Sequence, residues 1–334
     1  MANRPQYHKR ISLVLLAVII LTAFSSCGTP ARLSATYTDT FDTVTSFTMY
    51  TNKGTDFSAA SAAVHAELVR LDGIFDMYDE KSAVYQLNET GEVAYDPDLA
   101  AVLELASGFY EKTGGKLDVT LGRVFLIWHD FREGEGGVPE YGELLEASAG
   151  AGSDCYVIEN DRIKLKSGVK LDLGAVAKGY AAKKAAEAAE EIVGGDAFGN
   201  FILNVGGSVT AYGTKAHGDA WRVGIENPEG GVFTTLSVSD ISVVTSGDYQ
   251  RYRELDGVRY HHIIDPDTLM PAGRFRSVTV IHPDPFVADA LSTSLFCMSK
   301  EDGEALASLY GAEVLWIYSD MTAARTPGFS EYEK

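Results

Sequence analysis

The chain has few cysteines and little positive charge, and both shortages exclude classes of protein. Only 3 of its 334 residues are cysteine, and no two of them have metal-binding spacing. Neither a disulfide framework nor a cysteine metal centre is therefore expected. Lysine and arginine number 28 against 47 acidic residues, which gives a formal net charge of −19. Because such a body repels nucleic acid, no nucleic-acid partner is expected.

The sequence also lacks the common phosphate-binding loops. Neither G-x-x-x-x-G-K-[ST] nor G-x-G-x-x-G occurs, so a P-loop or a Rossmann dinucleotide site is not indicated. The apolar run at 11–24 is too short for a typical membrane span.

The N-terminus predicts a lipoprotein signal peptide over residues 1–26. Three basic residues precede the apolar run, and two serines then stand directly before Cys27. We expect Cys27 to be lipidated, residues 27–36 to form a tether, and a folded domain of residues 37–334 to be lipid-anchored to a bacterial membrane outside the cytoplasm. The alternatives are an ordinary cleaved signal or an uncleaved anchor, and both place the domain outside the cytoplasm. Removing residues 1–26 leaves 25 basic against 47 acidic residues, a formal charge of −22.

The composition, with 46% hydrophobic and 22% charged residues, is that of a globular protein. Helical spacing predicts helices around 64–75, 99–112, 174–193, 288–296 and 304–310. Strands are predicted at 37–51, 155–158, 162–165, 201–205, 208–212, 221–225, 232–238, 241–245, 259–264, 277–281 and 313–318. Strands clustered between a few helices, with a strand-rich second half, favour an α+β fold with mixed or antiparallel sheets over a regular βαβ alternation.

The segment "ADALSTSLF" (288–296) places three oxygen-bearing side chains on one helix face. These are Asp289, Ser292 and Thr293. In one interpretation Asp289 is a helix N-cap and the hydroxyls bond the preceding turn. In the other the segment holds a hard cation such as magnesium, which takes oxygen ligands and shares its shell with substrate phosphates.

Four further segments concentrate polar chemistry. In "LDLGAVAKGY" (171–180), Asp172, Ala175 and Lys178 recur every three residues where a helix begins, a place that favours an anionic ligand. The alternative is a capped helix with a solvated lysine. The segments "TSGDY" (245–249) and "TGGKLDVT" (113–120) either contact a nucleotide or are simple turns.

The fourth segment, "RYHHIIDP" (259–266), carries two adjacent histidines. Strand alternation is expected to send His261 and His262 to opposite faces, so that only one can lie in a site. Histidine is a common proton acceptor at neutral pH, although a structural role is the alternative.

Taken together along the chain, these blocks resemble the ApbE family, the FAD:protein FMN transferases. The resemblance rests on "TGGKLDVT", "LDLGAVAKGYAAKKA", "FILNVGGSV", "WRVGIENP", "VVTSGDYQRYRELDGVRYHHIIDP" and "VADALSTSLFCM", with "FDTVTSFTMY" and "FDMYDEKSAVYQLN" nearer the start. It extends from about residue 37 to the C-terminal region, and it implies an ApbE-like fold that binds FAD as substrate together with magnesium.

The resemblance also implies roles for individual residues. The metal ligands would be Asp289, Ser292 and Thr293 with the carbonyl of Ala175, and His262 would be catalytic. The flavin-nucleotide contacts would be Tyr78, Lys116, Leu117, Asp118, Asp172, Lys178, Ser246, Gly247 and Ile263.

The reaction implied is magnesium-dependent transfer of FMN from FAD to a threonine or serine of an acceptor flavoprotein with a respiratory-type FMN-binding domain, with release of AMP. The alternatives are an FAD pyrophosphatase that yields FMN and AMP, and a flavin- or solute-binding lipoprotein without turnover. The chain departs from the family pattern twice. It has Phe41-Asp42-Thr43 where Met-Gly-Thr is common, and Leu269 where glycine is common. Since leucine enters positive φ less easily than glycine, we expect the turn at Leu269 to differ.

Overall fold

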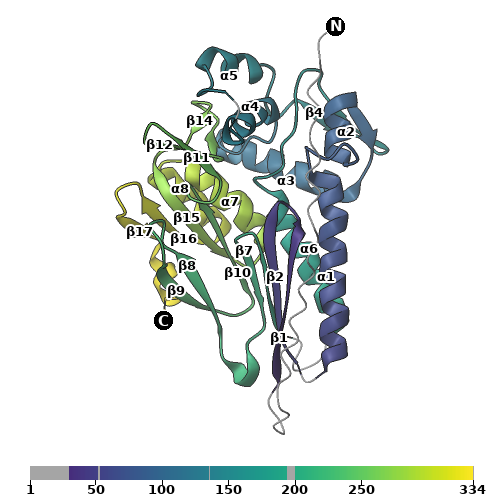
Figure 1. The fold of residues 1–334 in the computed structure, drawn as a ribbon, viewed down its shortest axis with the longest axis vertical. Helices are drawn as coiled ribbons and strands as arrows, with labels where there is room; N and C mark the ends of the chain where they lie inside the picture. Colours follow the sequence, from purple (N-terminus) through teal and green to yellow (C-terminus); the bar gives the residue numbers. More distant parts are fainter. Residues whose placement is uncertain (1–29, 52, 135, 194–199, 334) are drawn as a thin grey trace.

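The computed structural model describes residues 30–51, 53–134, 136–193 and 200–333. Its centre is an antiparallel eight-stranded sheet in the order β1-β2-β6-β7-β10-β15-β16-β17 (Figure 1). The strands are β1 (Ala31–Thr40), β2 (Thr43–Thr51), β6 (Phe201–Val205), β7 (Ser208–Tyr212), β10 (Ile241–Gly247), β15 (Phe275–His282), β16 (Glu313–Tyr318) and β17 (Ala323–Arg325). With helices packed against this sheet, the predicted α+β fold is confirmed.

Helices cover one face of the sheet. Helix α1 (Gly54–Phe75) packs against α6 (Ala177–Val193), α6 packs against α7 (Pro285–Cys297), and α7 lies on β10 and β15. Helix α8 (Lys300–Tyr310) continues the layer over β16. Since α7 touches helices on one side and strands on the other, nearly all of its residues are buried, polar ones included. The main hydrophobic core lies between these helices and the sheet.

A hairpin covers the opposite face of the sheet near β16. Strands β8 (Trp221–Glu226) and β9 (Val232–Val238) pair with each other and enclose a second core, which includes Trp221, Leu315 and Phe329. Two short 3-10 helices, Ala216–Gly218 and Pro327–Glu331, lie in the connecting segments.

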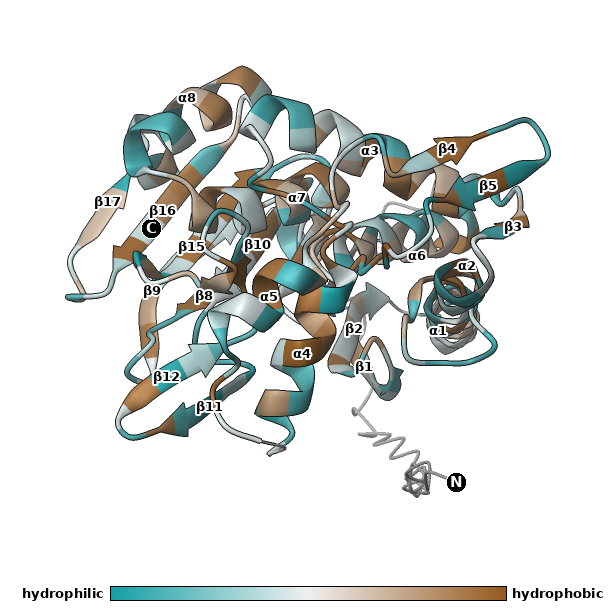
Figure 2. Cartoon of the chain, turned by 90° about the horizontal axis from the view of Figure 1, so that it is seen from above, coloured by the Kyte–Doolittle hydropathy of each residue, from teal (hydrophilic) through white to brown (hydrophobic). Residues whose placement is uncertain are grey.

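Smaller elements extend from this body on two sides. On one margin are α2 (Ala83–Thr90), α3 (Pro97–Thr113) and a three-stranded sheet of β3 (Glu92–Ala94), β5 (Arg162–Leu165) and β4 (Tyr156–Ile158). At the same end of the molecule in Figure 1 lie α4 (Gly122–Arg132), α5 (Tyr141–Ala147) and the hairpin of β13 (Ile264–Asp265) with β14 (Met270–Pro271). Figure 2 shows the hairpin of β11 (Tyr252–Leu255) with β12 (Val258–His261) on the side away from α2. A third core around Trp128 joins α4 and α5 to the turn after β13. None of the helices among the described residues is both long and apolar enough to span a bilayer.

The structure corrects three expectations. The tether expected at 27–36 is wrong from Ala31 onward, because β1 begins there and pairs with β2, while residues 27–29 and the expected signal peptide lie outside the described residues. The strand expected at 259–264 is interrupted after His261. Helices α4 and α5 were not predicted. Their apolar residues form short contiguous runs rather than a helical period, and the core around Trp128 stabilises them.

Both described cysteines agree with the sequence prediction. Cys155 and Cys297 are free, buried thiols, and Cys297 lies in the main core.

Candidate functional site

Asp289 lies in the interior of α7, and the N-cap interpretation is therefore wrong. The cap is Asp284, whose carboxylate accepts a hydrogen bond from the amide of Phe286 at 2.9 Å, and Pro285 follows at the first helical position. The Asp289 side chain is instead buried, with 3% of its surface exposed, between α7 and α6. A buried carboxylate requires a compensating partner.

Part of that compensation comes from the first turn of α6. The Asp289 Oδ2 atom accepts from the amide of Gly179 at 2.7 Å. Amides in the first turn of a helix have no intrahelical acceptor, and the positive end of the helix dipole favours an anion there. In a continuous helix the Gly179 amide would donate to the carbonyl of Ala175. Because it donates to Asp289, it does not occupy the Ala175 carbonyl.

Hydroxyl groups from two elements meet beside Asp289. The Ser246 hydroxyl on β10 is hydrogen-bonded to that of Ser292 on α7 at 2.8 Å and lies 3.4 Å from that of Thr293. Ser292 also donates to the main-chain oxygen of Asp289 at 3.0 Å. A hydroxyl bond to the preceding helical turn was part of the N-cap interpretation. The fold thus brings Ser246 to the same place as the predicted metal residues.

The oxygen atoms at this site fit a hard cation. Burial raises the pKa of the Asp289 carboxyl, while Lys178 and the Gly179 amide oppose that shift. Among the described residues, no three His, Cys, Asp or Glu side chains are grouped so that they could hold a metal. One carboxylate with hydroxyl and carbonyl oxygens is the incomplete shell that suits magnesium, which keeps water and binds substrate phosphate.

The segment before α6 is fixed by its own polar groups. The Asp172 carboxylate accepts from the Gly174 amide at 2.7 Å, and the Lys178 ammonium donates to the Gly174 carbonyl at 2.9 Å. Asn88 on α2 binds both main-chain groups of Leu171, at 2.7 and 2.9 Å. Burial raises the pKa of the Asp172 carboxyl, and Lys178 is among the cations that oppose the shift.

The two adjacent histidines have different environments. His261 Nε2 donates to the Ala272 carbonyl at 2.7 Å, and its Nδ1 accepts from the Ile263 amide at 3.2 Å, so both ring nitrogens serve the structure. The Nδ1 atom of His262 is buried without a hydrogen-bond partner among the described residues. Burial lowers the pKa of His262 well below its usual value, and the charge of Lys178 adds to that effect. His262 is therefore a neutral imidazole whose Nδ1 atom makes no hydrogen bond with the described part of the chain.

Arg251 links His262 to the turn between β1 and β2. Its carbonyl accepts from the His262 amide at 3.1 Å. Its guanidinium donates to the carbonyls of Phe41 at 3.2 Å and Asp42 at 2.5 Å. From the other side, Asp72 on α1 accepts from the Phe41 amide at 2.8 Å. Phe41 and Asp42 both have positive φ, of 54° and 46°, so this departure from Met-Gly-Thr retains a tight turn.

Two predicted flavin contacts, Tyr78 and Lys116, interact with side chains of α4 and of the turn after β13, respectively. The Tyr78 ring packs on His129 of α4 with centroids 4.6 Å apart, and burial raises the pKa of its phenol. The Lys116 ammonium is paired with Asp265 at 2.8 Å and with Asp267 at 2.7 Å, which joins this segment to the turn after β13.

The remaining predicted contacts are largely main-chain or buried groups. Leu117 is buried, and Asp118 accepts from the amide of Thr120 at 2.8 Å. Ile263 is buried directly after His262, and Gly247 ends β10.

Leu269 does not alter its turn as expected. It adopts φ 58°, the conformation that glycine would take, and its carbonyl accepts from the Trp128 indole at 2.8 Å. Burial of the leucine in the core around Trp128 offsets the cost of about 1–2 kcal/mol of this conformation.

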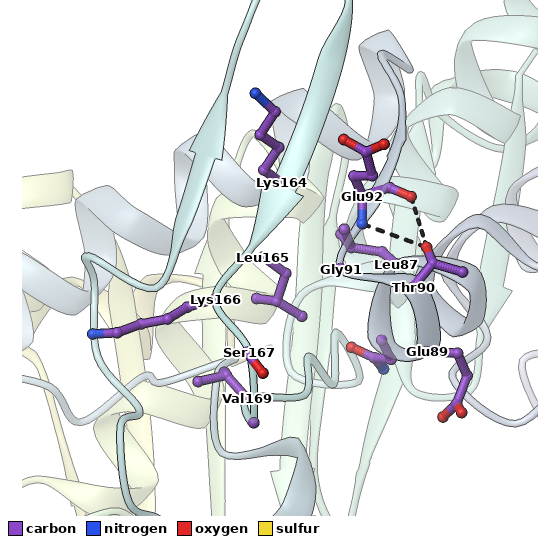
Figure 3. Close-up of a pocket in the computed structure, with 12 residues that line it drawn as sticks. Leu87, Glu89, Thr90, Gly91, Glu92, Lys164, Leu165, Lys166, Ser167 and Val169 are labelled. Atoms are coloured by element: carbon purple, nitrogen blue, oxygen red, sulfur yellow. Dashed lines mark hydrogen bonds between the residues drawn. The ribbon is translucent and has the colours of Figure 1, made fainter.

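A separate pocket of about 470 Å³ lies away from these residues. It is bounded by α2 and the segment after β5, and Figure 3 shows Lys164 and Lys166 beside it. None of the predicted site residues lines this pocket.

Sequence reasoning missed Arg251, His129 and Arg132 at the site. Arg251 stands within the quoted block 243–266, but only the folded chain shows that it reaches the β1–β2 turn. His129 and Arg132 lie on α4, which was not predicted. Fold and site together define an α+β protein in which a buried carboxylate lies beside hydroxyl groups, with a lysine and a neutral histidine that act on the same region.

Comparison with known proteins identifies this class. The ApbE family profile matches residues 41–316. A FAD:protein FMN transferase of Treponema pallidum is 32% identical over 93% of this chain and 92% of its own length. One from Haemophilus influenzae is 26% identical over 98% of both chains.

Solved structures agree with the sequence matches. The ApbE protein of Thermotoga maritima has a TM-score of 0.82 and 31% identity, covering 91% of this chain and 100% of its own. The Vibrio cholerae flavin transferase ApbE has a TM-score of 0.78 and 26% identity, covering 91% and 99%. The protein belongs to the ApbE family.

Proposed function

We propose that the protein transfers FMN from FAD to a threonine or serine hydroxyl of an acceptor flavoprotein, forming a phosphoester and releasing AMP. The relatives that it matches over nearly their whole length are named FAD:protein FMN transferases. Two observations together support the proposal. Asp289 is buried beside the hydroxyls of Ser246, Ser292 and Thr293. The buried Nδ1 atom of His262 has no hydrogen-bond partner among the described residues. The charge of Lys178 acts on both Asp289 and His262, which supports a role for all three residues at one site.

Phosphoryl transfer requires chiefly the positioning of the reactants and the stabilisation of charge, and different residues of the site have these roles. Magnesium bound by Asp289, Ser292, Thr293 and the Ala175 carbonyl would neutralise charge on the FAD diphosphate. Lys178 and the start of α6 supply positive potential in a body of net charge −19. The acceptor oxygen forms a bond to the FMN phosphorus, the bond from that phosphorus to the AMP oxygen breaks, and AMP leaves with the electron pair.

The imidazole of His262 takes the proton of the incoming hydroxyl. A base must be neutral to accept a proton, and burial keeps His262 neutral through the physiological range. The Arg251 carbonyl fixes the main chain at His262, and the Arg251 side chain fixes the β1–β2 turn.

One experiment separates the possible activities. The purified full-length protein in detergent is incubated with FAD, magnesium and an acceptor carrying an FMN-binding domain, and AMP and protein-linked flavin are followed. The proposal expects both products in equal amounts. Free FMN with AMP would instead indicate a pyrophosphatase, and intact FAD would indicate a binding protein without turnover.

Location at the membrane is a further part of the proposal. We infer that Cys27 is lipidated and anchors the domain outside the cytoplasm, on the basis of the sequence before it. Metabolic labelling with a fatty acid should mark the protein, and Cys27→Ser should abolish the label. A label that persists in the variant would contradict this anchor.

A further inference from the structure

Helix α4 ends in an arginine, one guanidinium nitrogen of which has no hydrogen-bond partner in the described part of the chain. Arg132 is its last residue, and the Nη1 atom is buried without a hydrogen bond among the described residues. The nearby Arg253 differs, since it donates to the carbonyl of Phe131 at 2.8 Å and lies over that ring. A buried cationic donor without an acceptor is unfavourable. Packing of the chain alone therefore does not explain the position of Arg132.

The surroundings of Arg132 are those of the flavin site. Its charge interacts with Tyr78 and Asp172, and it acts on His262. Lys178, from the start of α6, also acts on Asp172 and His262. Arg132 and Lys178, from separate elements, thus both act on the charges of Asp172 and His262. The geometry agrees, because the ring of Tyr78, a predicted flavin contact, packs on His129, which lies about one helical turn before Arg132 on α4.

The pKa of Arg132 follows from this environment. Burial lowers it, as does the neighbouring Arg251, while Tyr78 and Asp172 raise it. Arginine stays charged even so. A helix C-terminus also favours an arginine, but that interaction with the helix dipole does not give the Nη1 atom a hydrogen-bond acceptor.

Of the parts of FAD, only the diphosphate carries charge at neutral pH, since the adenine and the oxidised isoalloxazine are neutral. A forked guanidinium binds phosphate oxygens through two parallel hydrogen bonds. We propose that Arg132 binds the diphosphate of FAD, as a recognition residue on α4 in addition to the metal and histidine groups. This inference rests on FAD being the substrate.

The test compares Arg132→Gln with Arg123→Gln, a matched loss of charge near the other end of α4. Arg123 is partly exposed and donates only to the Gly168 carbonyl, at 3.3 Å. Dissociation constants for FAD, ADP and riboflavin are measured by titration without acceptor. In Arg132→Gln we expect FAD and ADP to bind about 10- to 100-fold more weakly and riboflavin to bind unchanged. In Arg123→Gln all three should bind as in the wild type.

A second variant guards against a folding defect. Arg132→Met removes the charge and needs no hydrogen-bond partner, so the ligand-free protein should melt at the same temperature or higher while ADP binding falls as in Arg132→Gln. A lower melting temperature of Arg132→Met would show that the guanidinium has a structural partner and would overturn the inference. Unchanged ADP affinity in either variant, or an equal loss for riboflavin, would overturn it too.

These binding assays do not depend on transfer. A wild-type protein that binds FAD but forms no protein-linked flavin would refute the proposed function and leave the role of Arg132 intact.

Discussion

Replacing Gly179 by alanine should separate the two helices that carry the proposed magnesium ligands. A Cβ atom at Gly179 would lie 2.5 Å from the Asp289 Cβ and 2.5 Å from the Pro285 carbonyl oxygen, with the Phe286 Cα at 3.1 Å. The three obstacles are main-chain atoms or a Cβ, so no change of rotamer relieves them. The helix α6 must move away from α7, which lengthens the 2.7 Å bond from the Gly179 amide to Asp289.

The magnitude follows from three contributions. Alanine is better than glycine in a helix by about 1 kcal/mol. Overpacking costs about 1–3 kcal/mol. Weakening a hydrogen bond to a charged group costs up to about 1.5–3 kcal/mol more. Gly179→Ala should therefore lower the free energy of unfolding by about 1.5–5 kcal/mol. It should also weaken the response to magnesium because Ala175 moves away from Asp289.

Gly73→Ala is the matched control. Gly73 is an exposed residue of α1 with nothing within 4 Å of its added Cβ, so the same substitution should stabilise the protein by about 0.5–1 kcal/mol. Urea unfolding measures both variants, and magnesium titration in the presence of FAD measures the site. If Gly179→Ala were as stable as Gly73→Ala and responded normally to magnesium, the close approach of α6 and α7 would not be what builds the site.

Three further predictions concern polar groups of the site. Asp289→Asn keeps an oxygen for the Gly179 amide but loses the charge, so the magnesium dependence of FAD binding should vanish in a titration while the fold persists; a normal magnesium response would mean that the ligand is misassigned. His262→Ala should bind FAD nearly as the wild type does, with transfer slowed by about 10² or more in an AMP-release assay. Burial lowers the folded-state pKa of His262. Its contribution to the free energy of unfolding is therefore complete above about pH 6.5 and is lost as the pH falls below that value. In urea unfolding, the difference in this free energy between pH 7.5 and pH 5.5 should be smaller for the variant than for the wild type. Arg251→Gln removes the bonds to Phe41 and Asp42, and FAD should bind about tenfold more weakly in the same titration, whereas unchanged affinity would exclude a role for that turn.

The sequence predicted most of the central sheet because its signals are local. Strands β6, β7 and β16 of this sheet, and β9 of the neighbouring hairpin, begin and end where their runs of β-branched and aromatic residues place them. Buried and more exposed side chains alternate throughout β6. Helix α4 was not predicted because its run "VFLIW" is apolar without a helical period. Tertiary packing around Trp128 decides its conformation. Leu269 shows the same dependence, since its positive φ is offset by burial and by a bond from Trp128.

The amino-acid sequence by itself determined the fold class, the oxygen-rich face of α7 and the family, because periodicity and motif order are properties of neighbouring residues. Only the tertiary structure decided that Asp289 binds the first turn of α6 instead of capping α7, that His261 is bonded at both nitrogens while His262 is not, and that the charges of Arg132 and Arg251 act on His262. Each of these depends on which groups reach a buried polar atom from distant parts of the chain. Which distant groups meet a buried polar atom is decided by packing and desolvation, and the spacing of residues in the sequence does not encode these.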